Sequence, residues 1–172
     1  ISYSFFLKIY GSIENSIKIT DDNRINVSDI KKHKEASYKV YTIDSGRLYT
    51  DRIHDIAAIL DNKIIEGPSL QFRDGPESTI QNLKADNNIV LEKGTPRKLR
   101  KLDGTVLSLL TGGAGNNNYW HWLYDVLPKL NLCTQSYSLT DIDYFLLPSN
   151  EKKFQKETLD CLNIPNHKRI SS

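Results

Sequence analysis

The segment of the chain that most constrains its fold spans residues 111–130 and reads TGGAGNNNYWHWLYDVLPKL. Residues 105–110, TVLSLL, precede it and have the composition of a β-strand. After the Gly-rich turn, apolar residues recur at the helical spacings of three and four: Trp120, Leu123, Leu127 and Leu130. The pattern therefore predicts a strand, a tight turn and a helix that begins just after Asn118. Pro128 lacks an N–H and crowds the preceding turn, so we expect a kink or a helix end near Leu127.

The same alternation continues to the end of the chain. A strand is predicted at residues 142–147, a helix at 151–162 and the start of another strand at 168. Strands that alternate with helices form βαβ units with a parallel sheet. Ligands of such sheets bind beyond the carboxyl ends of the strands, where the GGAGNNN turn is expected.

The first hundred residues instead have short strands separated by turn residues. Residues 56–60 and 63–66 flank Asp61-Asn62, and residues 99–102 and 105–110 flank Asp103-Gly104, so both pairs predict β-hairpins. Further turns or strands are expected at 38–43, 44–46, 70–72, 74–76 and 88–92. Ser28 is a candidate N-cap for a short helix through Lys34.

We therefore predict an α/β fold, with a β-hairpin-rich N-terminal part followed by βαβ Rossmann-like units. Residues 1–46 lack a clear periodicity, and we expect this segment to be partly β. Residues 47–172 are expected to form the N-terminal portion of a truncated domain. The chain contains no methionine, which leads us to expect a piece of a longer protein.

Composition excludes several classes of protein. With 38% hydrophobic and 26% charged residues, the chain has the profile of a globular domain, and it has no apolar run long enough to span a membrane. The net charge of +2 and the lack of aromatics among the basic clusters argue against nucleic acid as a partner. Cys133 and Cys161 lack the spacing of a metal site, and we expect buried free thiols.

The candidate chemistry lies on the predicted helix after the Gly-rich turn. His121 and Asp125 are four residues apart and so share one helix face. A carboxylate can orient an imidazole that accepts a proton, or Asp125 can itself take a proton from a substrate hydroxyl. The alternative is a surface ion pair worth about 0.2–0.5 kcal/mol.

Residues 118–130, NYWHWLYDVLPKL, resemble the signature of the glycosyltransferase family 61 catalytic domain. That pattern consists of Asn, an aromatic residue, His-Trp, then Asp and Leu-Pro-Arg/Lys-Leu. Residues 143–146, Phe154-Gln155 and Leu159 also resemble the family, as a strand and then a helix. The similarity is close over residues 112–130 and loose over 48–170.

The resemblance implies an inverting glycosyltransferase with a nucleotide-sugar donor and a glycan or glycoconjugate acceptor. It also implies a two-lobed GT-B-like architecture, of which this chain is the first lobe. An acceptor hydroxyl attacks the anomeric carbon and displaces a nucleoside diphosphate, which requires one base. Asp125 or His121 fills that role; we favour Asp125 as the base and His121 as the residue that orients the substrate.

The resemblance further implies a set of substrate-binding residues. The aromatic side chains are expected to stack on sugars, although core packing is at least as good an interpretation for one of the tryptophans. The Gly-rich loop is expected to place N–H groups near the diphosphate, or else to be a tight turn. Lys129 either adds charge to the site or is solvated, and we favour the solvated role. The implied set is Asn117, Asn118, Tyr119, Trp120, Trp122, Gly113 and Gly115.

No DxD-like pair lies near the motif, so we expect no cofactor and no required metal ion. The other function weighed is a non-catalytic carbohydrate-binding module; an α/β-hydrolase ranks last, since the chain lacks G-x-S-x-G. The expected location is the bacterial cytoplasm in capsule synthesis, with peripheral membrane association possible. The alternative is the secretory pathway lumen of a eukaryote.

Overall fold

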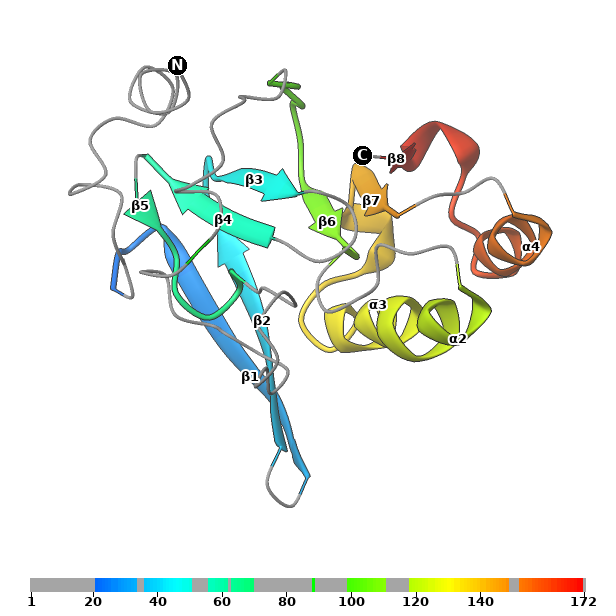
Figure 1. Cartoon of the computed structure of the whole chain (residues 1–172), viewed down its shortest axis with the longest axis horizontal. Helices are drawn as coiled ribbons and strands as arrows, with labels where there is room; N and C mark the ends of the chain where they lie inside the picture. The colour runs from blue at the N-terminus through cyan, green and yellow to red at the C-terminus, as the bar shows by residue number, and fades with distance from the viewer. Residues whose placement is uncertain are drawn as a thin grey trace. The chain divides into compact units, whose positions relative to one another are not determined.

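The computed structural model describes residues 21–33, 36–50, 56–61, 63–69, 88, 99–110, 118–148 and 152–171. The chain divides into two compact units (Figure 1). The first comprises Ile1–Asn26 and Tyr41–Arg100, and the second comprises Val27–Val40 and Lys101–Ser172. The described residues form a mixed α/β structure with small hairpin sheets and a parallel sheet. The boundary expected at residue 46 stays a prediction.

The first unit contains an antiparallel sheet of three strands, β3 (Arg47–Thr50), β4 (Ile56–Leu60) and β5 (Lys63–Ile64), in the order β3-β4-β5. Its β4–β5 hairpin confirms the prediction for residues 56–66, and Asp61 adopts the left-handed conformation in the turn, with φ 53°. Every residue of β4 is buried. Alternate β4 residues therefore contribute to two separate hydrophobic clusters, because successive side chains point to opposite faces of a strand.

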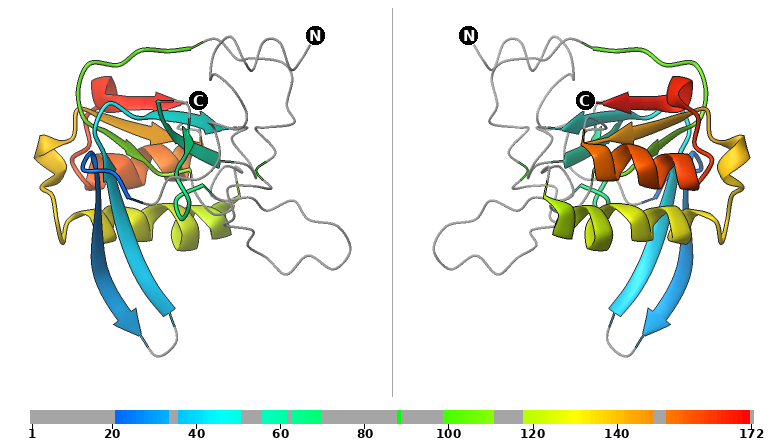
Figure 2. Two further views of the ribbon diagram at one scale, coloured as in Figure 1. Left: turned by 90° about the vertical axis from the view of Figure 1, so that its left-hand side faces the viewer. Right: turned by 90° about the vertical axis from the view of Figure 1, so that its right-hand side faces the viewer.

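A second sheet consists of β1 (Ile25–His33) and β2 (Ala36–Ile43), which lie side by side (Figure 2). The strand predicted at residues 38–43 is confirmed. The helix predicted from Ser28 is wrong, because β2 supplies a pairing partner along this segment. That pairing outweighs a local capping signal. The turn at residues 44–46 is also confirmed, since Ser45 has a positive φ of 56° there.

The second unit contains a parallel sheet of β6 (Val106–Ser108), β7 (Tyr144–Leu147) and β8 (Arg169–Ser171), in the order β6-β7-β8. The helix α4 (Lys153–Cys161) follows β7, and short 3₁₀ turns occur at Leu139–Asp141 and Asn166–Lys168. The predicted order of strand, helix, strand, helix and strand is thus confirmed. The structure shows a parallel sheet of three short strands, and the Rossmann-like assignment stays a prediction.

The hairpin predicted around Asp103-Gly104 is wrong. Residues 99–105 form no strand, and β6 pairs with β7 instead. Gly104 does form a turn, with φ 131°, and the next N–H, of Thr105, donates to Asp143 Oδ2 at 2.7 Å. A partner almost forty residues away in the sequence therefore determines this turn, and local turn chemistry contained no sign of it.

The helix after Asn118 runs through three consecutive segments: α2 (Tyr119–His121), the π-helical turn η4 (Trp122–Val126) and α3 (Leu127–Cys133). A kink or a helix end was expected near Leu127: the helix end is wrong, and the helix instead changes there from π-helical to α-helical. Pro128 cannot donate a hydrogen bond to the preceding turn, and the helix continues because that turn widens. Leu127 N–H donates to Trp122 O, five residues back, which is the π-helical pattern.

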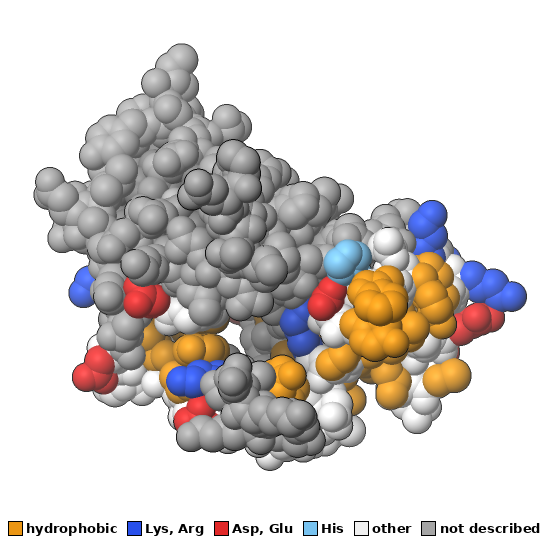
Figure 3. All heavy atoms as spheres, turned by 60° about the horizontal axis from the view of Figure 1, so that its bottom comes forward, with side chains coloured by type: hydrophobic (Ala, Val, Ile, Leu, Met, Phe, Trp, Pro, Cys, Tyr) orange, Lys and Arg blue, Asp and Glu red, His pale blue; other side chains and the backbone are white. Residues whose placement is uncertain are grey.

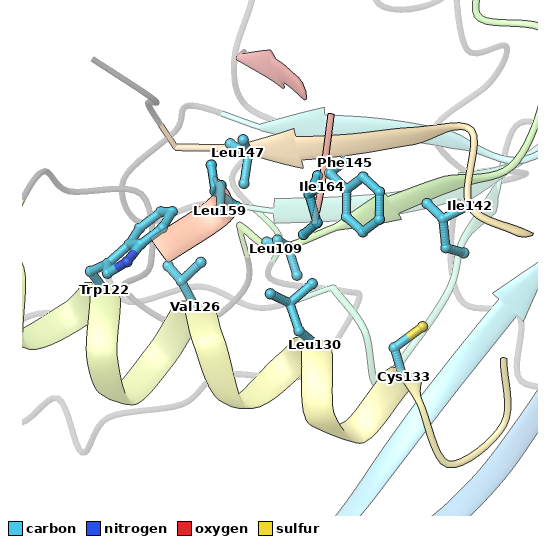
Figure 4. Close-up of a cluster of buried hydrophobic side chains, with 10 residues drawn as sticks. All are labelled: Leu109, Trp122, Val126, Leu130, Cys133, Ile142, Phe145, Leu147, Leu159 and Ile164. Carbon is cyan, nitrogen blue, oxygen red and sulfur yellow. The ribbon is translucent and has the colours of Figure 1, made fainter. Parts of the chain in front are cut away.

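The core of the second unit lies between this helix, the parallel sheet and α4 (Figure 4). The helix contributes residues at spacings of four, four and three, whereas Leu123 and Leu127 are only partly buried at its edge. The predicted helical period is correct. The buried face of the helix is centred on Trp122 and Val126, one residue before the expected Leu123 and Leu127. The buried cluster comprises Leu109, Trp122, Val126, Leu130, Cys133, Ile142, Phe145, Leu147, Leu159 and Ile164.

Cys133 is buried in that cluster, as expected, whereas Cys161 is exposed, so the expectation of two buried thiols holds for one of them. Burial raises the pKa of the Cys133 thiol, as it does for any acid that becomes charged on losing a proton. Within the described ranges, no helix combines the length and apolar character needed to cross a membrane.

Candidate functional site

His121 and Asp125 form a hydrogen-bonded pair at the start of the long helix. Asn118 caps this helix, because its Oδ1 accepts the N–H of Trp120 at 2.8 Å. His121 Nδ1 lies 2.5 Å from Asp125 Oδ2, and each of the two side chains is 33% exposed. The predicted shared face is therefore confirmed, and both groups remain accessible to a ligand.

The pair fixes the arrangement of protons when the imidazole is neutral. An ionised carboxylate only accepts hydrogen bonds, so Nδ1 carries the hydrogen that is shared with Asp125. The lone pair then lies on His121 Nε2, which has no hydrogen-bond partner among the described residues. An imidazole held in this tautomer can accept a proton at Nε2, and the carboxylate stabilises the resulting cation.

The π-helical turn places Asp125 in a backbone segment that differs from an ordinary helix. The turn ends at Val126, directly before the α3 residues Leu127 and Pro128. Single π-helical turns within α-helices occur often at functional sites. Here the turn carries the carboxylate of the pair, while the imidazole belongs to the preceding α-helical turn.

Lys129 lies half-buried beneath this segment. Its ammonium group donates to the carbonyl of Asp125 and, at 3.4 Å, to the carbonyl of Leu109. Leu109 directly follows β6, so Lys129 ties the helix to the carboxyl end of that strand. Burial lowers the pKa of Lys129 to about 8, and the Asp125 charge opposes part of that shift. The expectation of a solvated lysine is therefore wrong.

Three exposed aromatic residues neighbour the pair in the sequence. Tyr119, Trp120 and Tyr124 are 54%, 63% and 59% exposed. The rings of Trp120 and Tyr124 lie with their centroids 4.3 Å apart, at an interplanar angle of 37°. Hydrophobic side chains gather on one part of the surface, with histidine and acidic side chains at their edge (Figure 3). Sequence reasoning missed Tyr124, although its position four residues after Trp120 places both on one face.

Trp122 has a different environment from Trp120. It is 1% exposed, and its Nε1–H donates to Thr158 Oγ1 of α4 at 2.9 Å. A ring enclosed in this way presents no face to a sugar. Trp122 is thus the tryptophan that packs in the core, and we remove it from the substrate-binding set.

Of the remaining expected site residues, the structure describes some and not others. Gly113, Gly115 and Asn117 lie outside the described residues. The side-chain oxygen of Asn118 is occupied as a helix cap. In the part of the chain that the structure describes, no group of three or more His, Cys, Asp or Glu side chains could hold a metal ion. Independence from metal ions stays a prediction.

Comparisons with protein-family models, with curated proteins and with solved structures found no match to this chain.

Proposed function

We propose that this chain supplies the catalytic base of a glycosyltransferase, with His121 and Asp125 acting together. The observation that carries the proposal is the 2.5 Å contact between His121 Nδ1 and Asp125 Oδ2 in a pair that is one-third exposed. The resemblance of residues 118–130 to glycosyltransferase family 61 gives the reaction class. We favour a functional interpretation over a surface ion pair because Trp120 and Tyr124, which directly precede His121 and Asp125 in the sequence, are exposed.

The geometry favours roles opposite to those expected from the sequence. Asp125 uses Oδ2 to hold Nδ1, which leaves His121 Nε2 to take the proton. We therefore propose His121 as the general base. Asp125 becomes the positioning residue, which fixes the tautomer and stabilises the imidazolium ion.

The proposed reaction is one inverting displacement. As the acceptor oxygen forms its bond to the anomeric carbon, the bond from that carbon to the donor's phosphate oxygen breaks. The acceptor proton moves to His121 Nε2, and the nucleoside diphosphate leaves with the bonding electron pair. A positioned base contributes about 10²–10⁴-fold to the rate of such a step.

The exposed aromatic rings of Trp120 and Tyr124 form the proposed acceptor-binding surface. Pyranose rings have apolar faces, and an aromatic ring can cover such a face without losing a hydrogen bond. The parallel sheet and its helices are consistent with a first GT-B lobe, which we propose as the role of this chain. We also propose that the enzyme works in the bacterial cytoplasm on glycans or glycoconjugates.

The test is turnover of a panel of nucleotide sugars with glycan acceptors, followed as released nucleoside diphosphate, in the protein that carries this chain. We expect His121→Ala to reduce kcat by about 10²–10⁴-fold. Asp125→Asn should reduce it strongly as well, because the amide can donate a hydrogen bond to Nδ1 and so favours the wrong tautomer.

Two matched controls lie elsewhere in the second unit. His167→Ala removes an exposed histidine, and Asp141→Asn removes an exposed carboxylate, both from short 3₁₀ turns. These variants should turn over normally. Normal turnover in His121→Ala, with the fold confirmed by circular dichroism, would end the assignment of the base.

A non-catalytic carbohydrate-binding module is the second candidate. The observation in its favour is the exposure of the three aromatic rings of Tyr119, Trp120 and Tyr124. It predicts glycan binding without any nucleotide sugar, with a loss in Trp120→Ala and none in His121→Ala. A panel of immobilised glycans distinguishes this outcome from donor-dependent turnover.

A further inference from the structure

A buried amide donor without a partner lies at the N-terminus of α4. Gln155 is 0% exposed, and its Nε2 has no hydrogen-bond partner among the described residues. Leaving a buried donor unpaired is costly, so native proteins rarely retain one without a reason. The amide therefore calls for a partner that the described residues do not provide.

The orientation of the amide is determined by its other end. Gln155 Oε1 accepts the backbone N–H of Lys152 at 3.1 Å. Exchanging the oxygen and nitrogen atoms would place two donors against each other, so the flipped assignment is excluded. The unpaired group is thus the NH₂ group. It lies at the first turn of α4, because its own oxygen is bonded to the residue that precedes the helix.

The first turn of α4 has further features that suit an anion. Its first N–H groups, of Lys153 and Phe154, have no acceptor within the helix, and the helix dipole makes this end positive. The first turn contains no acidic residue, and Lys152 and Lys153 are exposed there. Lysines at a helix N-terminus are unfavourable for the helix dipole, and a bound anion would stabilise them. Lys153 also forms an exposed ion pair with Glu157, at 3.5 Å.

We propose that the N-terminus of α4, together with the Gln155 amide, binds a phosphate group. The helix follows β7 and begins beyond the carboxyl end of that strand, which is where α/β sheets bind ligands. Backbone N–H groups at a helix N-terminus suit a phosphate, and the amide adds a donor to it. The amide is closed off from solvent, so the anion reaches it through a local rearrangement at the start of α4.

The first turn of α4, where the phosphate site is proposed, contacts the helix that carries the His–Asp pair. Phe154, in the first turn of α4, contacts Tyr119 with ring centroids 5.0 Å apart and Trp122 at 6.1 Å. The two helices therefore begin next to each other. This inference rests on the proposed function only in its choice of phosphate source, which is the donor diphosphate or a phosphate on the acceptor.

The test is isothermal titration calorimetry of the whole chain with pyrophosphate, inorganic phosphate and uridine diphosphate, at low ionic strength and without any turnover. We expect pyrophosphate to bind. Gln155→Glu keeps an oxygen that can accept from Lys152 but replaces the donor by a negative charge. It should weaken binding by about 10- to 100-fold, because a hydrogen bond to a charged group is lost.

A second pair of variants does not depend on the buried amide. Lys152→Gln removes a charge at the helix N-terminus and should weaken binding, whereas Lys156→Gln removes an exposed charge one turn further along and should have a smaller effect. Gln135→Glu, at an exposed position after α3, is the control for the added carboxylate. All variants are checked by thermal unfolding.

The outcomes separate this site from the glycosyltransferase proposal. Tighter binding of uridine diphosphate than of pyrophosphate identifies the donor as the source, and equal binding identifies a phosphate outside the donor. Pyrophosphate binding in a protein that lacks transferase activity supports this site while the proposed function fails. No binding of any of the three probes, or wild-type binding by a folded Gln155→Glu variant, overturns the inference.

Discussion

Lys129 provides a direct test of how the helix is attached to the sheet. Its ammonium group is buried beneath the His–Asp pair and donates to the carbonyls of Asp125 and Leu109. Burial lowers its pKa from 10.5 to about 8. We expect a contribution to the free energy of unfolding that changes with pH, and that disappears in Lys129→Met, which keeps a long side chain without a charge.

The sign follows from the number of protons bound in each state. Below pH 8 both the folded and the unfolded chain hold the proton, so Lys129 adds no slope. Between about 8 and 10.5 the unfolded chain keeps a proton that the folded chain has lost, so the free energy of unfolding rises with pH. At 1.36 kcal/mol per pKa unit the full rise is about 3 kcal/mol. Because the side chain is only half-buried, solvent screening reduces this, and we expect about 1–3 kcal/mol.

The assay is urea denaturation of the wild type and of Lys129→Met at several pH values from 6.5 to about 10.5. The difference between the two free energies of unfolding cancels the other titrating groups, and it should shift in favour of the wild type as the pH rises through 8. A difference that stays flat over this range would show that the ammonium is solvated. A shift in favour of Lys129→Met would contradict the sign of the reasoning.

Two other predictions test interactions in the two units. Hydrogen bonds from Arg24 lower the pKa of Asp22 to about 2 from 3.8, so the stability that this carboxylate adds is present above about pH 4 and is lost as the pH falls toward 2. Arg24→Gln should return the midpoint of the Asp22 titration, followed by NMR, toward 3.8; an unchanged midpoint would refute the cause. Gly104→Ala should cost more than about 1 kcal/mol in denaturation, because φ is 131° and the new Cβ would lie 2.4 Å from Asp143 Oδ2. Wild-type stability in Gly104→Ala would show that the turn relaxes freely.

The second unit was the more predictable part of the fold. Its strands and helices alternate with clear periodicity, and the buried residues of the long helix follow the expected spacing. The errors came where a distant partner decided the structure. Asp143 determines the turn at Gly104, and β2 turns the segment after Ser28 into a strand. No local pattern in the sequence records such pairings.

In the candidate site, too, local spacing was predictable from the sequence and packing against distant residues was not. Spacing alone placed His121 and Asp125 on one face, because four residues nearly complete a helical turn. Spacing did not show which tryptophan is buried, since Trp120 and Trp122 are both near the helix start and only the packing of α4 distinguishes them. It also did not reveal that Lys129 turns inward, because a lysine on a helix is solvated unless buried carbonyls accept from it.

The departures from local rules are concentrated in one helix. Pro128 lies in the interior of the helix, the turn before it is π-helical, and Lys129 buries an ammonium group. Each of these is unfavourable for a helix taken alone. Natural proteins keep such conflicts mainly where function requires them. All three lie within one turn of Asp125, so these folding costs support the proposal that the His–Asp pair is the functional part of this chain.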